Sequence, residues 1–291
     1  MPIRERILAM GITGSGKSYQ WLKMAEILLP TGAIFRCLDT DNAIPFMLET
    51  QFPKLMPENG GNVYVHLAYD WPEYKIGVNW LRHKGLTEQQ LNSMSEHLKH
   101  AYTTPIKDSD WAIVDMADEA WTTVQNHFVS EVFDEDAGDY FLEVRKELHA
   151  RGGKSKVDGK TATSIMPEGL SGWVDWVVIN KLYNDWIRPI VYQVPCHVYA
   201  TTKVDRIDRR EKDSEILMLF GDLGVKPTGQ KKLGHQMHTV LLLIPGKDGW
   251  MVTTAKDRAG RPYFKKAPFV SFYYQYLVAK AGWSIPKTGG G

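Results

Sequence analysis

Residues 11–18 read Gly-Ile-Thr-Gly-Ser-Gly-Lys-Ser and match the pattern of a phosphate-binding loop at every required position. The loop follows the short apolar run 7–10 and precedes a helical pattern over 17–29, so we expect it where a strand turns into a helix. Its glycines allow backbone N–H groups to face phosphate oxygens, and the positive end of the helix dipole adds to their effect. We expect ATP to bind here through Gly11, Thr13, Gly14, Ser15, Gly16, Lys17, Ser18 and Tyr19.

Three side chains are expected to act on the triphosphate and its Mg²⁺ ion. Lys17 would neutralise the β- and γ-phosphate oxygens, and the Ser18 hydroxyl would bind the metal. Asp115 directly follows the apolar run 111–114. An acid at the carboxyl end of such a strand is the expected partner of a phosphate loop and would hold Mg²⁺ through water.

Two further acids are candidates for orienting the attacking water, and each has a structural alternative. Glu119, next to Asp118, is either the catalytic acid or a solvated acid in the first turn of a helix. Asp41 closes the segment Asp39-Thr40-Asp41 after the second predicted strand, 33–38. It is either a catalytic acid or the N-cap of a helix over 43–50.

Two polar segments later in the chain are candidates for contact with the γ-phosphate. The strand over 197–201 ends in hydroxyls, so Thr202 or Thr201 would sense this phosphate, unless both are ordinary threonines of a strand end. Residues 256–261 carry three cations. Lys256 and Arg258 alternate along the chain and would reach the nucleotide of a neighbouring subunit, or else belong to a solvated turn.

Short apolar strands alternate with helical segments, which predicts an α/β fold with a mainly parallel central sheet flanked by helices. Runs over 240–244 and 250–254, joined by a Gly-Lys-Asp-Gly turn, predict antiparallel strands near the C-terminus. We expect one domain over 1–286 with insertions near 134–170 and 203–232, and a flexible tail over 287–291. Within the first insertion, 151–164 is predicted to be a mobile loop.

Bulk composition restricts the class of protein but not its ligand. The chain has 291 residues, a net charge of +1 and 43% hydrophobic residues, so any basic binding surface must be local. Its two cysteines, Cys37 and Cys196, lie in apolar runs and are predicted to be buried, with no disulfide framework or zinc site. Neither a signal peptide nor a membrane-spanning run is apparent, so we expect a cytoplasmic protein.

The order of these segments resembles the RecA-like ATPases, especially the small RecA-like recombination ATPases encoded by bacteriophages. In members of this family, the phosphate loop is followed along the chain by an acid past the second strand, a strand-end Asp and a polar strand end. A DNA-contacting loop and a strand pair come next. Here these are 11–18, Asp41, Asp115, Thr202, 203–232 and 240–254. The resemblance implies that Asp41, at the place of the usual Glu, activates water. It also implies that Lys256 and Arg258 act in a neighbour's site.

The resemblance predicts an ATPase that acts on single-stranded DNA in recombination, annealing or replication, assembles as a ring or filament, and works in the host cytoplasm if a phage encodes it. The segment 203–232 has eight Lys and Arg residues against six Asp and Glu residues, a weak electrostatic argument for DNA. Two alternatives remain open. One is a GTPase switch that reads guanine through Thr202-Lys203-Val204-Asp205. The other is a slowly hydrolysing assembly protein stabilised by nucleotide.

Overall fold

The computed structural model describes residues 4–134, 138, 139, 142, 146, 174–230, 232–247 and 249–286. The predicted mobile loop over 151–164 and the predicted tail over 287–291 lie outside these residues, as does most of the predicted insertion over 134–170. None of the described helices combines the length and apolar character needed to cross a membrane.

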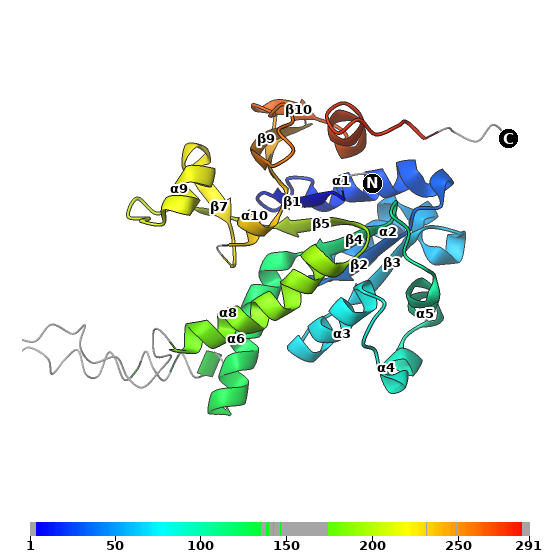
Figure 1. The fold of residues 1–291 in the computed structure, drawn as a ribbon, viewed down its shortest axis with the longest axis horizontal. Helices are drawn as coiled ribbons and strands as arrows, with labels where there is room; N and C mark the ends of the chain where they lie inside the picture. Colours follow the sequence, from blue (N-terminus) through cyan, green and yellow to red (C-terminus); the bar gives the residue numbers. More distant parts are fainter. Residues whose placement is uncertain are drawn as a thin grey trace, which may run out of the picture.

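An eight-stranded sheet forms the centre of the molecule, in the order β10-β9-β8-β1-β5-β4-β2-β3 (Figure 1). Six strands are parallel, and at one end of the sheet β9 pairs antiparallel with both β8 and β10. One strand, β5, separates β1 from β4. The strands are β1 (Arg6–Met10), β2 (Phe35–Asp39), β3 (Val63–Leu67), β4 (Trp111–Asp115), β5 (His197–Thr202), β8 (Thr239–Gly246), β9 (Gly249–Asp257) and β10 (Ala267–Phe269).

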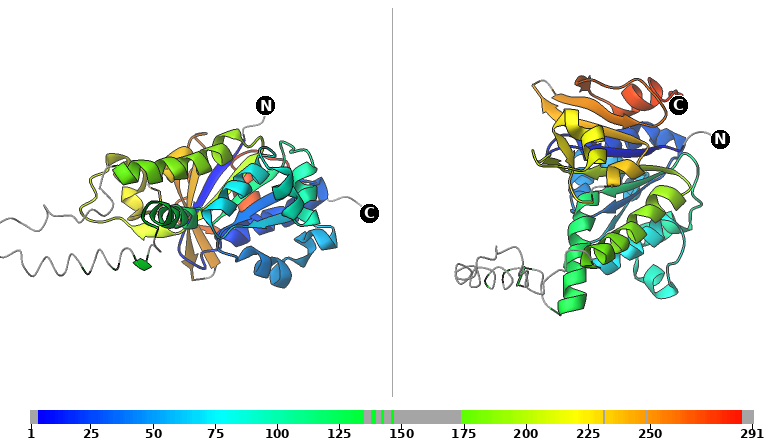
Figure 2. Two further views of the ribbon diagram at one scale, coloured as in Figure 1. Left: turned by 90° about the horizontal axis from the view of Figure 1, so that it is seen from below. Right: turned by 60° about the vertical axis from the view of Figure 1, so that its left-hand side comes forward.

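Helices cover both faces of the sheet (Figures 1 and 2). Alternate residues of a strand point to opposite faces, and the two faces of β1 bury Leu8 and Met10 on one side and Ile7 and Ala9 on the other. The first face packs on α3 (Trp71–Leu81), α5 (Glu96–Thr103), α6 (Ala117–Phe133) and α8 (Val174–Arg188). The second packs on α1 (Lys17–Leu28), α2 (Ile44–Gln51) and the π-helix η6 (Tyr273–Val278).

Short elements complete the described chain. The connection from α2 to β3 contains the 3-10 helices η2 (Pro53–Leu55) and η3 (Pro57–Asn59), and η1 (Leu29–Thr31) follows α1. Helix α4 (Glu88–Ser93) lies between α3 and α5, and the π-helix η4 (Pro189–Gln193) continues α8. The segment 203–232 contains β6 (Val204–Arg206), α9 (Ser214–Phe220), η5 (Gly221–Leu223) and β7 (Val225–Pro227), and α10 (Leu233–Gln236) follows it.

The predicted fold class is confirmed: the chain is α/β, with a mainly parallel central sheet, flanking helices and antiparallel strands near the C-terminus. Cys37 and Cys196 are buried and unpaired, as predicted. The sequence did not indicate β3, a strand at the end of the sheet, or β10. Within the segment 203–232, β6 and β7 pair with each other and not with the main sheet, and we call residues 204–227 the β6–β7 unit. Its helix α9 contributes Ile216 and Phe220 to the hydrophobic core.

Candidate nucleotide-binding site

The predicted phosphate loop connects β1 to α1 in a conformation that needs glycine at one position in particular. Gly16 has φ of 84°, which favours glycine, and a Cβ atom there would lie 2.6 Å from the indole ring of Trp250. The Trp250 indole donates from Nε1 to the Gly14 carbonyl at 3.2 Å. Its ring centroid lies 4.8 Å from that of Tyr19. The start of β9 therefore packs directly on the loop, a contact that the sequence did not indicate.

Lys17 lies inside the loop and is buried. Its ammonium group donates to the carbonyl oxygens of Gly11 at 2.9 Å and Ile12 at 3.0 Å. Burial lowers the pKa of Lys17, and nearby acids, Asp115 foremost, oppose this shift. The buried Ser15 hydroxyl has no hydrogen-bond partner among the described residues. The loop thus carries a buried cation and a buried hydroxyl that has no partner in the part of the chain that the structure describes.

Asp115, the last residue of β4, is buried and held in place at both carboxylate oxygens. Trp21 of α1 donates from Nε1 to Oδ2 at 2.9 Å, and Thr201 of β5 donates from Oγ1 to Oδ1 at 2.5 Å. Burial raises the pKa of Asp115, while hydrogen bonds from Thr201, Trp21 and Ser18 act in the opposite direction. The two predicted magnesium-binding residues, Ser18 and Asp115, are therefore neighbours.

The segment after β2 places its two acids in different environments. Asp39 is buried beside Asp115 in the sheet register and accepts hydrogen bonds from the N–H groups of Asp41, Asn42 and Ile44. Burial is the main cause that raises the pKa of Asp39 to about 7. Asp39 thus binds the N–H of Ile44, the first residue of α2. The N-cap of α2 is Ala43, without a side-chain capping hydrogen bond, so the alternative in which Asp41 is the N-cap is wrong. The side chain of Asp41 is exposed at the same edge of the sheet.

The two threonines that end β5 have different partners. The Thr201 hydroxyl is bound to Asp115, whereas the Thr202 hydroxyl donates to the carbonyls of Lys203 at 3.2 Å and Thr228 at 3.3 Å. The Thr202 carbonyl accepts from the N–H of Gly11 at 3.1 Å. The end of β5 is therefore attached to the first residue of the phosphate loop.

Glu119 and its neighbour Asp118 both interact with Lys203, the residue that follows β5. Nζ of Lys203 lies 2.5 Å from Glu119 Oε1 and 4.0 Å from Asp118 Oδ2. Asp118 is buried, and its Oδ1 accepts from the Lys203 backbone N–H at 3.3 Å. Burial raises the pKa of Asp118. The sequence did not single out Lys203 as a partner of these acids, although its position beside the strand-end threonines was visible.

The predicted fingers lie at the opposite edge of the sheet from the chain's own phosphate loop. Lys256 pairs with Val240 near the start of β8, which runs parallel to β1. Its ammonium group donates to three carbonyls at the end of α10, those of Gly234, His235 and Met237, at 2.9, 3.0 and 2.7 Å. Burial lowers the pKa of Lys256 to about 8.

Arg258 and Arg261, the other two cations of this segment, differ in their surroundings. Arg258 is exposed and makes a 2.8 Å hydrogen bond to the His235 carbonyl, so it shares an acceptor with Lys256. Arg261 forms a bidentate ion pair with the buried Glu5, at 2.6 and 3.0 Å. Of the three cations, Arg258 has the most accessible side chain.

The structure thus brings most of the predicted site residues to one edge, where the parallel strands β1, β2, β4 and β5 end. Those at this edge are the phosphate loop, Asp41, Asp115, Glu119 and Thr202, whereas Lys256 and Arg258 are not. Ligands of open α/β sheets bind at this kind of edge. Trp21 and Thr201 hold Asp115. Only tertiary contacts reveal the role of Trp21, because nothing in its sequence context distinguishes it from a core tryptophan.

The donors at this edge fit a magnesium-bound phosphate. The Lys17 ammonium group is buried with only carbonyl acceptors, and the Ser15 hydroxyl is buried with none among the described residues. A phosphate group would supply acceptors for both. Ser18 and Asp115 offer oxygen atoms, which are the ligands that Mg²⁺ prefers.

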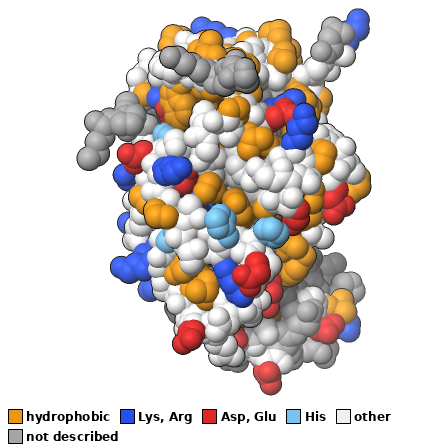
Figure 3. Space-filling view, turned by 90° about the vertical axis from the view of Figure 1, so that its right-hand side faces the viewer, with side chains coloured by type: hydrophobic (Ala, Val, Ile, Leu, Met, Phe, Trp, Pro, Cys, Tyr) orange, Lys and Arg blue, Asp and Glu red, His pale blue; other side chains and the backbone are white. Residues whose placement is uncertain are grey.

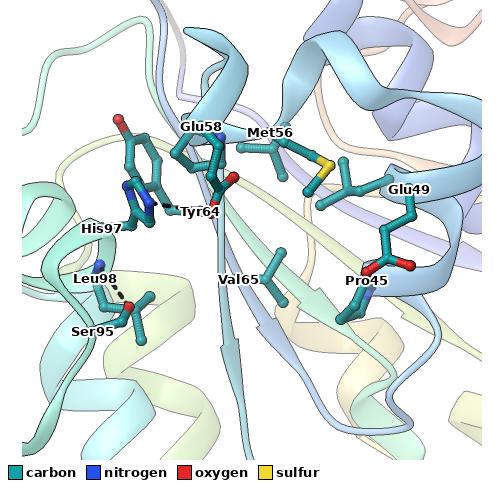
Figure 4. Close-up of a pocket in the computed structure, with 12 residues that line it drawn as sticks. Pro45, Glu49, Met56, Glu58, Tyr64, Val65, Ser95, His97 and Leu98 are labelled. Carbon is teal, nitrogen blue, oxygen red and sulfur yellow. Dashed lines mark hydrogen bonds and ion pairs between the residues drawn. The ribbon is translucent and has the colours of Figure 1, made fainter.

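Two other hollows in the described surface contain no residue of the phosphate loop. One, of about 160 Å³, lies beside the edge strand β3 and is lined by residues of α2, η3, β3 and α5, and by Met56 (Figure 4). His97 and Glu58 form a 3.1 Å ion pair across it. The other, of about 340 Å³, lies between α3, α6 and α8. The face shown in Figure 3 mixes apolar, basic and acidic side chains, with no extended area of a single charge.

No model of a known protein family matches the sequence, and a search of curated proteins finds no match. Among solved structures, the crystal structure of the RadB recombinase is similar to this chain. Its TM-score is 0.45 and its sequence identity is 14%, over 90% of this chain and 85% of that chain. This similarity concerns the course of the chain as a whole, and no ligand or activity of this chain is inferred from it. The strand order and the site described above rest on this chain's own contacts.

Proposed function

We propose that this protein is a RecA-like ATPase that acts on single-stranded DNA and binds its nucleotide between copies of the chain. The observation that carries the proposal is the arrangement of Lys17, Ser18 and Asp115 at one edge of the sheet. Asp115 is fixed there by Trp21 and Thr201, so the carboxylate is preorganised next to the phosphate loop. Recombination, annealing or replication in a phage-infected host cytoplasm is the setting that the family resemblance implies.

In this proposal, the loop binds the phosphates and its neighbours position them. Lys17 would exchange its two carbonyl partners for phosphate oxygens, and Ser18 and Asp115 would hold Mg²⁺. The metal would supply positive charge to the β- and γ-phosphate oxygens. Thr202, at the end of β5, accepts the Gly11 N–H and would respond to the terminal phosphate.

We assign the orientation of water to Asp41 rather than to Glu119. The side chain of Asp41 is exposed at the carboxyl edge of the sheet, and Asp39 binds its N–H and so fixes its backbone. Glu119 is instead engaged by Lys203 at 2.5 Å. An acid that must accept or orient a proton acts best when it is within reach of water and not bound to a cation.

Lys256 and Arg258 support a shared site. They lie at the edge opposite the chain's own phosphate loop, so they would act on the nucleotide of a neighbouring copy. A cation contributed from a neighbour acts on charge that develops in the transition state. Arg258, exposed and bound to one carbonyl in the structure, is the better candidate of the two.

The DNA contact is assigned to the segment 203–232. Arg206, Arg209, Arg210 and Lys212 are exposed on β6 and the turn that follows it. No ion pair is found for these four side chains among the described residues. Cations of this kind bind phosphate backbones without regard to sequence. Because Thr202 and Lys203 contact Thr228, this unit is attached to the end of β5 at the nucleotide site.

Nucleotide binding and turnover test the proposal. Wild-type protein should bind ATP with Mg²⁺, hydrolyse it, and do so faster with single-stranded DNA. Lys17→Ala should weaken binding by roughly a hundredfold or more, because hydrogen bonds to charged groups contribute about 1.5–3 kcal/mol each. The control is Lys23→Ala, which removes a lysine of the same helix that pairs with Glu26.

Other outcomes of the same assay identify the alternatives. A preference for GTP that is lost in Asp205→Asn would establish the GTPase switch. Tight ATP binding with turnover that DNA does not raise would indicate the assembly protein. Equal ATP binding by wild type and Lys17→Ala would refute the proposed site.

A further inference from the structure

Lys203 is the first residue after β5, and its charged group is at the nucleotide edge of the sheet. Its ammonium group lies 2.5 Å from Glu119 and 4.0 Å from Asp118. The side chain is 44% exposed, so it is held by these acids and not by packing. Lys203 is also among the charges that affect the pKa of Lys17, the cation of the phosphate loop. Lys17 and Lys203 are therefore both cations of this edge, and the ammonium group of Lys203 is bound to a carboxylate.

Both backbone groups of Lys203, the N–H and the carbonyl, make hydrogen bonds. Its N–H donates to the buried Asp118 at 3.3 Å, and its carbonyl accepts from the N–H of Thr228 at 3.0 Å. The preceding residue, Thr202, accepts from the N–H of Gly11 at 3.1 Å. The chain at Lys203 thus lies between the phosphate loop and the β6–β7 unit, which starts at the next residue.

A terminal phosphate would compete with Glu119 for the ammonium group. Such a phosphate carries a charge of about −1.5 to −2 at pH 7, compared with −1 for a carboxylate. The lysine stem has four carbons and rotates freely, so the ammonium group can exchange partners while the anchored backbone stays in place.

We propose that Lys203 binds the γ-phosphate, and that Glu119 is the residue that holds Lys203 away from it. This inference rests on the proposed function and assigns Lys203 the discrimination between triphosphate and diphosphate. Glu119 is then a positioning residue that sets how much binding energy is needed to release the lysine. Asp118 remains bound to the Lys203 backbone in both arrangements.

The same exchange would link nucleotide to the basic β6–β7 unit. Withdrawal of Nζ from Glu119 removes the ion pair that ties the residue before β6 to α6. Lys203 also contacts Thr228, the residue after β7, so both ends of the β6–β7 unit meet at Lys203. By thermodynamic reciprocity, a ligand on Arg206, Arg209 and Arg210 that favours the released arrangement would also favour triphosphate.

Binding measurements on four variants test the inference: Lys203→Gln, Glu119→Gln, their double variant and Lys203→Arg. The probes are a β,γ-imido triphosphate and the diphosphate, each with Mg²⁺, so the readout does not depend on turnover. Lys203→Gln should lower the preference for triphosphate over diphosphate by about tenfold to a hundredfold. Glu119→Gln should raise it, Lys203→Arg should retain part of it, and the double variant should match Lys203→Gln.

A matched control and a second measurement separate this role from damage to the fold. Lys226→Gln removes a lysine of the same unit that pairs with Glu211 at 2.7 Å, and should leave the preference unchanged. Hydrogen exchange over residues 204–227 should change when the imido triphosphate binds to wild type, and not when it binds to Lys203→Gln.

The outcomes distinguish failure of the inference from failure of the proposed function. If Lys203→Gln weakens both nucleotides equally, or if Glu119→Gln lowers the preference for triphosphate, the inference is wrong and the proposed function stands. If wild-type protein binds neither probe, the proposed function fails and the inference fails with it.

Discussion

Trp21 donates a 2.9 Å hydrogen bond from its indole N–H to Oδ2 of Asp115, across the contact between α1 and the end of β4. Because α1 starts at Lys17, within the last two residues of the phosphate loop, one helix contacts both the loop and the carboxylate. The hydroxyl of Thr201 binds the other oxygen of Asp115 at 2.5 Å. This relationship fixes the carboxylate through two uncharged donors.

Replacing Asp115 with Asn should leave much of the nucleotide affinity but remove magnesium-dependent turnover, because the amide keeps the shape and loses the charge. We expect a loss of roughly a hundredfold or more in turnover, since metal stabilisation of transition-state charge is worth several kcal/mol. Turnover is measured across a magnesium titration, with Trp21→Phe as the companion variant. Trp21→Phe should raise the magnesium concentration needed for half-maximal turnover. An unchanged magnesium dependence in both variants would refute the metal site.

Replacing Asp41 with Asn should lower turnover at saturating ATP while leaving ATP affinity unchanged. A positioned acid contributes roughly 10²–10⁴ in rate, so the loss should be at least tenfold. Glu49→Gln, an exposed acid of α2, is the control. If Asp41→Asn turns over normally and Glu119→Gln loses turnover without any change in nucleotide preference, Glu119 is the catalytic acid instead.

Arg258→Ala should bind ATP almost normally and hydrolyse it poorly, because a cation from a neighbour stabilises charge that develops only in the transition state. Mixing Arg258→Ala with Lys17→Ala should recover part of the activity at interfaces that combine an intact loop with an intact finger. Wild-type turnover per chain should also rise with protein concentration. Activity that neither recovers on mixing nor depends on concentration, down to a demonstrated monomer, would exclude a shared site.

The double variant Arg209→Gln/Arg210→Gln should bind single-stranded DNA more weakly. If each residue contacts one phosphate, the slope of log K against log salt should become shallower by about 0.7 per contact. Lys84→Gln, at an exposed lysine in the turn after α3, is the control. Fluorescence anisotropy with a labelled oligonucleotide at several salt concentrations provides the measurement. An unchanged salt slope would place the DNA contact elsewhere.

His197 should make the protein less stable in acid. Burial lowers its pKa to about 4, and its Nδ1 accepts the N–H of Glu5 at 2.9 Å. Between pH 4 and 6.5 the unfolded chain binds more protons than the folded one, so the free energy of unfolding falls as pH falls through this window. His197→Asn should reduce this slope by up to about 1.4 kcal/mol per pH unit. Urea unfolding at several pH values measures it, and an unchanged slope would contradict the assignment.

The sequence alone determined the alternation of strands and helices, and it located the glycine-rich turn between β1 and α1 and the strand-end Asp115. These are local properties: glycine spacing, apolar runs and the residues at their ends. Parallel strands place their carboxyl ends at one edge, so even the meeting of Asp41, Asp115 and Thr202 at that edge could be predicted. The sequence offered Asp41 as a catalytic acid or an N-cap, and it did not indicate that Asp39 would accept the N–H of Ile44.

Only the tertiary structure decided which side chains of distant segments contact one another. Asp39 accepts the Ile44 N–H, Trp21 reaches Asp115, and Trp250 packs on Gly16. Residues 84 positions apart form the Lys203–Glu119 pair, and no periodicity connects them. Lys256 binds two carbonyls of α10 and that of Met237, which follows it, although its spacing from Arg258 indicated only a common face. Such contacts depend on how helices dock on the sheet, a property of the whole core and not of any local segment.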